Sequence, residues 1–471
     1  MGLFYAEGSD SSTITDERLG DIIKSTLTQH AANIGHKLER VVLVPPEFTR
    51  YHSKAGLISQ FIYDQLQEAI VDVLPALGIH APMTDSEISK HLFRVHDWRN
   101  DVVTSGMVPS ELVAAPSDGK VNDPWPAQVN KLLWEGKHDL IVSIGQVVPH
   151  EVMGMANNNK NIFVGTRGSD AINFSHFIGA VYGMEQMMGR ANNPLCQVLN
   201  YASEHFLKDF PLLYIQKVVL RADDGQLVTR GVFIGDDDEC FLRASALSLE
   251  VNFKVLEHLL EKVVVYLHPE YKSTWLGNKS IYRTRMAIAD GGELIILAPG
   301  VKHFGEDTRI DELIRKYGYR TTPEILLYLD QSRHLIENLS AAAHLIHGSS
   351  EGRFRIRYCP GVLTRKELKS VGFEYGDLTD MLQMYSIDGL NEGFNTTRDG
   401  SENLYYISNP SLGLWACRSR FDMSNQSDEI LESSDGKSNY FNIHRIHNVS
   451  MLVSAEDHLP FRKCKKRGMK M

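Results

Sequence analysis

The chain has 471 residues, and at roughly 150 residues per domain this length predicts two or three domains. Hydrophobic residues make up 43% and charged residues 23% of the chain, which is typical of a globular protein that buries its core without disulfide or metal staples. The formal net charge of −10 argues against nucleic acid and anionic membrane surfaces as partners.

Cysteine usage and the first residues bear on location. Five cysteines, an odd number without a Cys-x-x-Cys pair, argue against a secreted disulfide scaffold and a thiolate zinc site. The chain starts without a signal-peptide pattern, and no apolar run reaches the roughly 18 residues that a membrane span needs. We therefore expect a cytoplasmic protein. Nineteen histidines raise the question of which ones do chemistry.

Strands and helices are expected to alternate in the first half of the chain. The apolar runs at 40–45 and 139–145 predict buried strands, the second of them central in a parallel sheet. Three- and four-residue spacing of apolar positions predicts a helix over 54–77, and residues 127–137 also favour a helix. Residues 213–235 predict a β-hairpin with an Asp-Gly turn.

A second α/β series follows a predicted helix at 241–261. Its expected strands are 262–267, 293–298 and 353–359, and its expected helices are 276–289, 308–317, 322–345 and 364–370. The fold class is therefore α/β, with two α/β domains built on mostly parallel sheets. We expect a first domain over 1–261, a second, Rossmann-like domain over 262–394, and a mixed C-terminal segment, 395–471, of open placement.

Polar clusters follow two of the predicted strands, where ligands bind in open α/β sheets. Glu47, Thr49 and Arg50 come after the first strand; Glu47 and Arg50 would clamp an anion there or form a surface ion pair. His150 comes after the central strand, in the run Gly145-Gln-Val-Val-Pro-His. Between them lies His96-Asp97, a candidate base beside a carboxylate or an ordinary loop histidine.

A fourth cluster combines small, amide and basic residues. It holds Asn157-Asn158-Asn159-Lys160, then Gly165-Thr166-Arg167-Gly168, then His176. Such residues favour a phosphate cradle with a nearby cation. His176, which follows the apolar residues Ile172 and Phe174, is on pattern alone more often a core histidine than a ligand.

In order, residue type and spacing these clusters resemble the lactate racemase family, enzymes that carry a nickel-pincer nucleotide. That family has Asp-x-Thr-Arg, His-Asp, Gly-x-x-x-Pro-His, a Gly-rich stretch with Lys, and a later His. Further along it has Tyr-Gln-x-x-Lys ahead of Gly-Gly, where this chain has Trp275-Leu276-Gly277-Asn278-Lys279 ahead of Gly291-Gly292. The resemblance covers about residues 35–300.

The resemblance implies roles for individual residues. Lys160 would bind the nickel-pincer nucleotide covalently, His176 would be the protein ligand of nickel, and His96 and His150 would be the acid/base pair. Arg50 and Lys279 would hold the substrate carboxylate across an interdomain cleft. Trp275 would line the substrate site, and Glu47, Thr49 and Gly165 would contact the cofactor.

Departures from the family pattern concern substrate and cofactor attachment. Glu47 stands where Asp is usual, Asn158-Asn159 replaces Gly-Gly, and Val164-Gly165 replaces Pro-Gly.

The polar content and Trp275 resemble the branch that acts on sugar acids, which implies a D-gluconate/D-mannonate 2-epimerase. A racemase of lactate or malate, and a non-catalytic binder that lost the cofactor, stay open as alternatives. The oligomeric state is open too, with a homodimer as one option.

Overall fold

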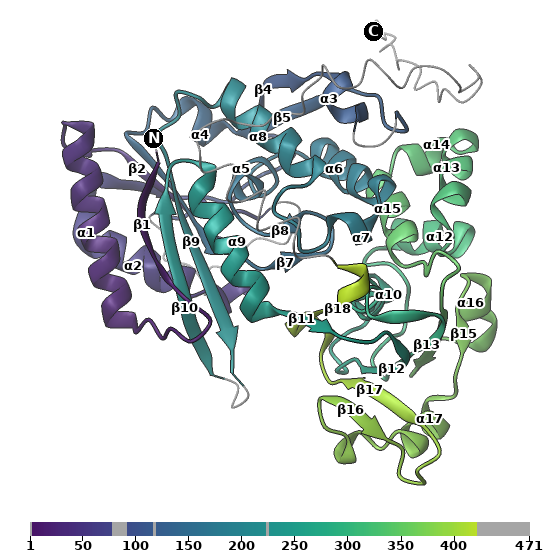
Figure 1. Ribbon diagram of the computed structural model, residues 1–471. Helices are drawn as coiled ribbons and strands as arrows, with labels where there is room; N and C mark the ends of the chain where they lie inside the picture. Colours follow the sequence, from purple (N-terminus) through teal and green to yellow (C-terminus); the bar gives the residue numbers. More distant parts are fainter. Residues whose placement is uncertain (1, 78–91, 116–118, 223–225, 422–471) are drawn as a thin grey trace, which may run out of the picture.

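The structure, a computed structural model, describes residues 2–77, 92–115, 119–222 and 226–421 (Figure 1). Two six-stranded sheets, each flanked by helices, organise these residues. Most neighbouring strands run parallel, which confirms the expected α/β class with two α/β domains.

The first sheet has the strand order β1-β10-β9-β6-β2-β3. Its strands are β1 (Leu3–Gly8), β2 (Val41–Val44), β3 (Ile70–Val73), β6 (Leu140–Gln146), β9 (Leu212–Arg221) and β10 (Leu227–Gly235). The predicted central strand is confirmed, because β6 pairs in parallel with β2 on one side and β9 on the other. The predicted hairpin is also confirmed as β9–β10, and its turn residues 223–225 lie outside the described residues.

Helices cover both faces of this sheet, because alternate residues of its strands enter two separate cores. One face packs on α1 (Asp16–Ile34) and α2 (Ala55–Leu66). The other face supports α5 (Asn159–Phe163), α6 (Ser169–Tyr182), α7 (Met184–Met187), α8 (Pro194–Phe206) and α9 (Asp238–Asn252). Small additions on this side are β4 (Val102–Val108), α3 (Ser110–Ala114), β5 (Trp125–Asn130), α4 (Lys131–Glu135), β7 (Pro149–His150) and β8 (Gly154–Met155).

The second sheet has the order β15-β14-β13-β12-β17-β16, all parallel except the β16–β17 pair. Its strands are β12 (Leu260–Tyr266), β13 (Ile288–Ala298), β14 (Arg355–Pro360), β15 (Glu374–Tyr375), β16 (Gly393–Thr396) and β17 (Asn403–Ile407). A two-stranded parallel sheet joins β11 (Phe253–Leu256) to β18 (Leu414–Cys417). The late strands β17 and β18 therefore pair with the much earlier strands β12 and β11, a placement that local sequence pattern could not reveal.

Helices connect the strands of this second part. They are α10 (Thr274–Gly277), α11 (Lys279–Tyr282), α12 (Thr308–Tyr317), α13 (Thr322–Gln331), α14 (Arg333–Ile336), α15 (Leu339–His347), α16 (Arg365–Ser370) and α17 (Leu378–Met384). The expected helix at 308–317 is confirmed as α12. The expected helix at 322–345 is broken into α13, α14 and α15, and the one at 276–289 is reduced to the short α10 and α11.

Three helix predictions in the first half were too long. The helix expected over 54–77 ends at Leu66, where Gln67 takes φ 41° and the β-branched run that follows becomes β3. The helix expected over 127–137 is only α4, since its first residues pair with β4 as strand β5. The helix expected over 241–261 ends at Asn252 and gives way to β11. In each case a strand partner distant in sequence overrides the local pattern.

Candidate active site

Two loops at the carboxyl ends of neighbouring strands bring the first predicted site residues together. Arg50 lies in a 3₁₀ turn, η1 (Phe48–Ser53), just beyond β2. His150 and Glu151 lie just beyond β6, the parallel neighbour of β2. Carboxyl ends of parallel strands share one edge of the sheet, so these side chains meet there.

Lys160, on α5, joins the same group. Burial, and then the charge of Arg50, lower the pKa of Lys160 from 10.5 to about 7, while Glu151 opposes the shift. Near neutral pH a large fraction of this amine is therefore unprotonated, which makes it a nucleophile.

The second domain contributes Lys279, on α11, and Arg283, which follows that helix. Arg283 forms an ion pair with Glu151 at 3.0 Å, and each side chain is 13% exposed. Burial opposes ionisation of Glu151, yet the charges of Arg283 and Lys279 hold the pKa of Glu151 well below its usual value. Glu151 is therefore a carboxylate shared between the two domains.

We call the resulting group the basic cluster. Its members are Arg50, His150, Lys160, Lys279 and Arg283, which act electrostatically on one another around Glu151. The two arginines and two lysines around one carboxylate leave an excess of positive charge. The cluster can thus attract and orient an anionic ligand.

The ring of His150 has a defined tautomer. Its Nδ1 accepts hydrogen bonds from the backbone N–H groups of Val152 (3.1 Å) and Met153 (3.2 Å). Burial, and then the charge of Lys160, lower the pKa of His150 well below its usual value. The ring is therefore neutral and presents a proton on Nε2.

His96 lies in a different environment. Its Nε2 donates to the backbone carbonyl of Arg167 (3.0 Å), and its Nδ1 accepts from the side-chain amide of Asn130 (2.9 Å). Its side chain is 3% exposed, and burial lowers its pKa. Both ring nitrogens thus bond to groups of the first domain, and neither bonds to a member of the basic cluster.

His176 meets the second domain through a helix pair. It lies on α6, against which α15 packs (Figure 1). His347, the last residue of α15, has a pKa lowered first by burial and then by the charges of His344 and His176, while Glu151 opposes the shift. His347 therefore links His176 to the basic cluster. Its Nε2 is buried without a hydrogen-bond partner among the described residues.

The remaining predicted site residues have local roles in this structure. Glu47 pairs with Arg50 at 3.5 Å. Gly165 packs so tightly that an added Cβ would lie 2.4 Å from the Asn161 carbonyl oxygen. The Trp275 ring lies 4.1 Å from the ring of His344, centroid to centroid. The side chain of Thr49 lies outside the described part of the chain.

Sequence reasoning missed Glu151, Arg283 and His347 as site residues. Glu151 carried a usable signal, since it directly follows His150. The local signals at Arg283, one of several polar residues, and at His347, three residues after His344, were too weak to select them, because only the contact between the domains brings them to the site.

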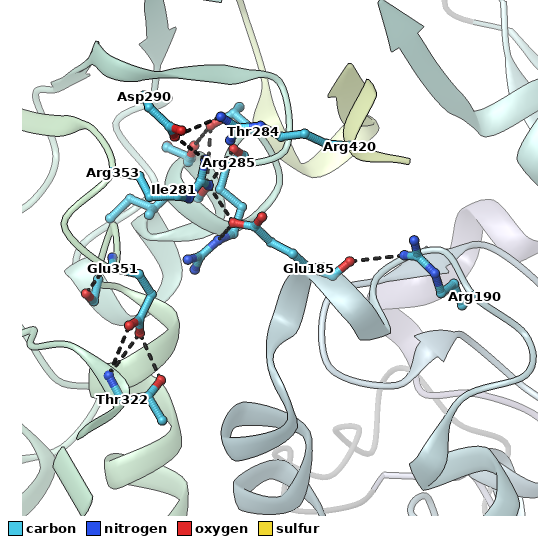
Figure 2. Close-up of polar contacts among 12 residues, drawn as sticks. Glu185, Arg190, Ile281, Thr284, Arg285, Asp290, Thr322, Glu351, Arg353 and Arg420 are labelled. Atoms are coloured by element: carbon cyan, nitrogen blue, oxygen red, sulfur yellow. Dashed lines mark hydrogen bonds and ion pairs between the residues drawn. The ribbon is translucent and has the colours of Figure 1, made fainter. Parts of the chain in front are cut away.

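A second ionic group joins the domains beside the site (Figure 2). Glu185, on α7, accepts from Arg285 Nε at 2.9 Å and from Arg353 Nη2 at 2.5 Å. Asp290 in turn pairs with Arg353 and, at 2.8 Å, with Arg420. These contacts fix α7 of the first domain against the second domain.

Three general properties of the described residues complete the picture. No helix among them has the length and apolar character needed to cross a membrane. The four cysteines within the described ranges are buried and unpaired. In the same ranges no group of three or more His, Cys, Asp or Glu side chains converges on a metal position.

Known proteins resemble the chain in sequence and in fold. Residues 5–189 match the family model of the lactate racemase N-terminal domain. A lactate racemase from Thermoanaerobacterium thermosaccharolyticum is 26% identical over 302 residues, which cover 59% of this chain and 65% of that protein. The match thus spans slightly less than two thirds of the relative.

Two solved structures share the fold. A crystal structure of a protein from Thermotoga maritima superposes with a TM-score of 0.71 at 22% identity, covering 87% of this chain and 100% of that one. The lactate racemase apoprotein from Thermoanaerobacterium thermosaccharolyticum superposes with a TM-score of 0.63 at 18% identity, covering 86% and 93% of the two chains. Residues 5–189 are thus similar in sequence to the lactate racemase N-terminal domain, and the two solved structures show that the described residues share their fold.

Proposed function

We propose that this chain is an isomerase that inverts the configuration at C2 of a 2-hydroxy acid. The observation that carries the proposal is the basic cluster, which gathers cations from both domains around the ends of β2 and β6. A 2-hydroxy acid presents a carboxylate beside its reacting carbon, so a site with excess positive charge suits it.

Arg50 and Lys279 are the proposed carboxylate ligands. Arg50 offers a planar fork with several donors and Lys279 a compact charge from the opposite domain. Held from both sides, the carboxylate fixes the position of C2 before reaction.

Proton transfer at the C2 hydroxyl is assigned to His150 and His96. Two groups are expected because the two stereoisomers present the hydroxyl differently to the site. His150 can hydrogen-bond the hydroxyl through Nε2, and it must give up its two backbone bonds at Nδ1 to act as a base. His96 must exchange its bond to the Arg167 carbonyl for one to the substrate.

A hydride acceptor is also required, since no side chain accepts hydride. The family resemblance points to a nickel-pincer nucleotide, which when bound supplies reversible acceptance of the C2 hydride. The residues fit such a group: Lys160 offers an amine with a pKa of about 7 for covalent attachment, and His176 offers an imidazole nitrogen for nickel. Arg167 offers an anion contact, because its buried Nε and Nη1 have no hydrogen-bond partner among the described residues.

We assign a sugar acid of the D-gluconate/D-mannonate type as substrate. Glu151 is an ionised acceptor within the cluster, so it can receive hydrogen bonds from additional substrate hydroxyls. Lactate lacks such hydroxyls, and the second carboxylate of malate would meet like charge at Glu151.

The test measures C2 inversion of D-gluconate, lactate and malate by protein co-expressed with cofactor-making enzymes and loaded with nickel. We expect D-gluconate to be converted to D-mannonate fastest. Glu151→Gln, which keeps the shape and removes the charge, should lower kcat/KM for gluconate by about 10-fold or more through one lost charged hydrogen bond. Turnover of lactate or malate alone would contradict the sugar-acid assignment, and cofactor loading without any turnover would support a binding protein.

A further inference from the structure

The segment that precedes Lys160 is held by a continuous chain of side-chain hydrogen bonds. Asn157, Asn158 and Asn159 are buried, at 7%, 3% and 5% exposure. In the branch through Asn158, Asn157 Nδ2 donates to Gln216 Oε1 (2.6 Å), Gln216 Nε2 donates to Asn158 Oδ1 (3.0 Å), and Asn158 Nδ2 donates to Asp238 Oδ1 (3.0 Å). In the branch through Asn159, Tyr214 OH donates to Asn159 Oδ1 (2.7 Å), Asn159 Nδ2 donates to Asn200 Oδ1 (2.9 Å), and Asn200 Nδ2 donates to Asp238 Oδ2 (2.5 Å).

Asp238 is the point at which the two branches of this chain meet. One carboxylate oxygen accepts from the Asn158 branch and the other from the Asn159 branch. An acceptor-only group is required there, because both neighbours present amide N–H groups. An amide side chain at position 238 would oppose one of them with its own N–H groups.

The backbone at this segment needs such support. Asn157 has φ 75° and Asn158 has φ 52°, the left-handed region that side chains other than glycine enter at a cost. Gly145 on β6 makes the arrangement feasible, since an added Cβ would lie 2.5 Å from Asn157 Oδ1. The strained turn ends directly at α5, whose second residue is Lys160.

We propose that Asp238 is a positioning residue for Lys160, because it ties Asn158 and Asn159 together and so holds the start of α5 in the site. The inference rests on the proposed function for the use made of Lys160. In the family pattern two glycines stand at 158 and 159. In this chain the side chains of Asn158, Asn159 and Asp238 fix the turn through hydrogen bonds instead.

The charged and titratable groups that act on Lys160 come from four other elements. Arg50 lies on η1, His150 ends β7 and Glu151 follows it, Arg283 follows α11, and Cys196 lies on α8. If the start of α5 loosens, the Lys160 amine leaves this environment and gains water. Its titration should then move toward that of an ordinary lysine.

The experiment follows acetylation of Lys160 by limiting acetic anhydride against pH, read by peptide mass mapping of the full chain prepared without cofactor. In the unmodified protein we expect the rate at Lys160 to rise through about pH 7. Asp238→Asn should move this midpoint upward by about one pH unit or more. An unchanged midpoint in Asp238→Asn would overturn the proposal.

The matched control is Asp237→Ala. Asp237 caps α9 by accepting from the Glu239 backbone N–H (3.1 Å) and makes none of the bonds of the asparagine chain. Asp237→Ala should lower the melting temperature and leave the Lys160 midpoint in place. An equal shift in both variants would reduce Asp238 to a general structural role and overturn the proposal.

Two further variants keep the proposal testable. Asn200→Ala breaks only the Asn159 branch, so it should shift the midpoint in the same direction by less, and no shift would contradict the proposal. In an Asn158→Gly/Asn159→Gly background, Asp238→Asn should add no further shift, because both side chains that connect Asp238 to the start of α5 are gone. This readout needs no cofactor, so the shift would persist even if the proposed isomerase activity failed.

Discussion

At the scale of single residues, buried amines are the feature with the clearest consequence. Lys217, on β9, is 0% exposed, and its Nζ has no hydrogen-bond partner among the described residues. Burial, and then the charge of Lys54, lower the pKa of Lys217 from 10.5 to about 7. Below pH 7 the folded protein must therefore hold an unfavourable buried charge.

This shift predicts a specific pH dependence of stability. Between pH 7 and 10.5 the unfolded chain keeps the Lys217 proton that the folded chain has lost, so the free energy of unfolding rises with pH across that range. Lys217→Met should stabilise the protein most at pH 6 and progressively less up to pH 10. Denaturant unfolding at pH 6, 8 and 10 measures this. Arg243→Met, which removes an exposed ion pair with Glu239 that does not act on Lys217, is the control and should change stability by at most about 1 kcal/mol. An equal gain from Lys217→Met at every pH would contradict the reasoning.

The sequence made part of the site predictable at this scale. Arg50, His150 and Lys160 each lie a few residues after a strand, so order and spacing along the chain sufficed to select them as candidates. Arg283, Glu185 and His347 depend on contacts between domains, which no local pattern encodes.

At the scale of elements, the end of α5 is packed so closely that Gly165 cannot be replaced by a larger residue without a clash. Gly165 follows α5, donates its N–H to the Lys160 carbonyl at 3.1 Å, and lies against Ala76 near the end of β3. Gly165→Ala would place a methyl group 2.5 Å from the Ala76 Cβ. We expect a loss of about 1–3 kcal/mol in the free energy of unfolding, as in other overpacked cores.

The control for this change is Gly56→Ala, within α2. No atom lies within 4 Å of a Cβ added at Gly56, so this variant should be neutral or gain up to about 1 kcal/mol from helix propensity. Thermal and denaturant unfolding of both variants measures the difference. Equal stability of the two variants would contradict the prediction, since it would mean that the atoms around Gly165 move to accept the added methyl group without a cost in free energy.

Elements were predictable where local and long-range preferences agree. The run at 139–145 is apolar throughout and becomes β6, buried on both faces. The region 54–77 has helical spacing throughout, yet Ile70 to Val73 pair with β2 as β3, because β-branched residues gain more from the sheet than from a longer helix.

At the scale of the whole molecule, ion pairs of Glu185 with Arg285 and Arg353 hold α7 against the second domain. Arg285 is only 4% exposed at its side chain and depends on Glu185 for its counter-charge. Glu185→Gln leaves this guanidinium without a carboxylate, so we expect a loss of about 2 kcal/mol from a partly buried pair. Hydrogen exchange should rise in α7 and around Arg285.

The control for Glu185→Gln is Glu239→Gln. Glu239 pairs with Arg243 four residues along α9 at 2.5 Å, on the exposed surface and within one domain. This variant should leave exchange at the domain contact unchanged. Unaltered exchange in Glu185→Gln would mean that apolar contacts, such as α6 on α15, hold the domains alone.

The central claim is that Lys160 and the basic cluster serve a covalently held cofactor for inversion of a hydroxy acid. The most direct measurement is the intact mass of the chain, with its nickel content, after co-expression with the cofactor-making enzymes. We predict an adduct at Lys160 with about one nickel per chain, lost in Lys160→Ala and retained in His150→Ala, which should lose turnover by at least about 100-fold. An unmodified mass without nickel in the unmutated protein would contradict the claim.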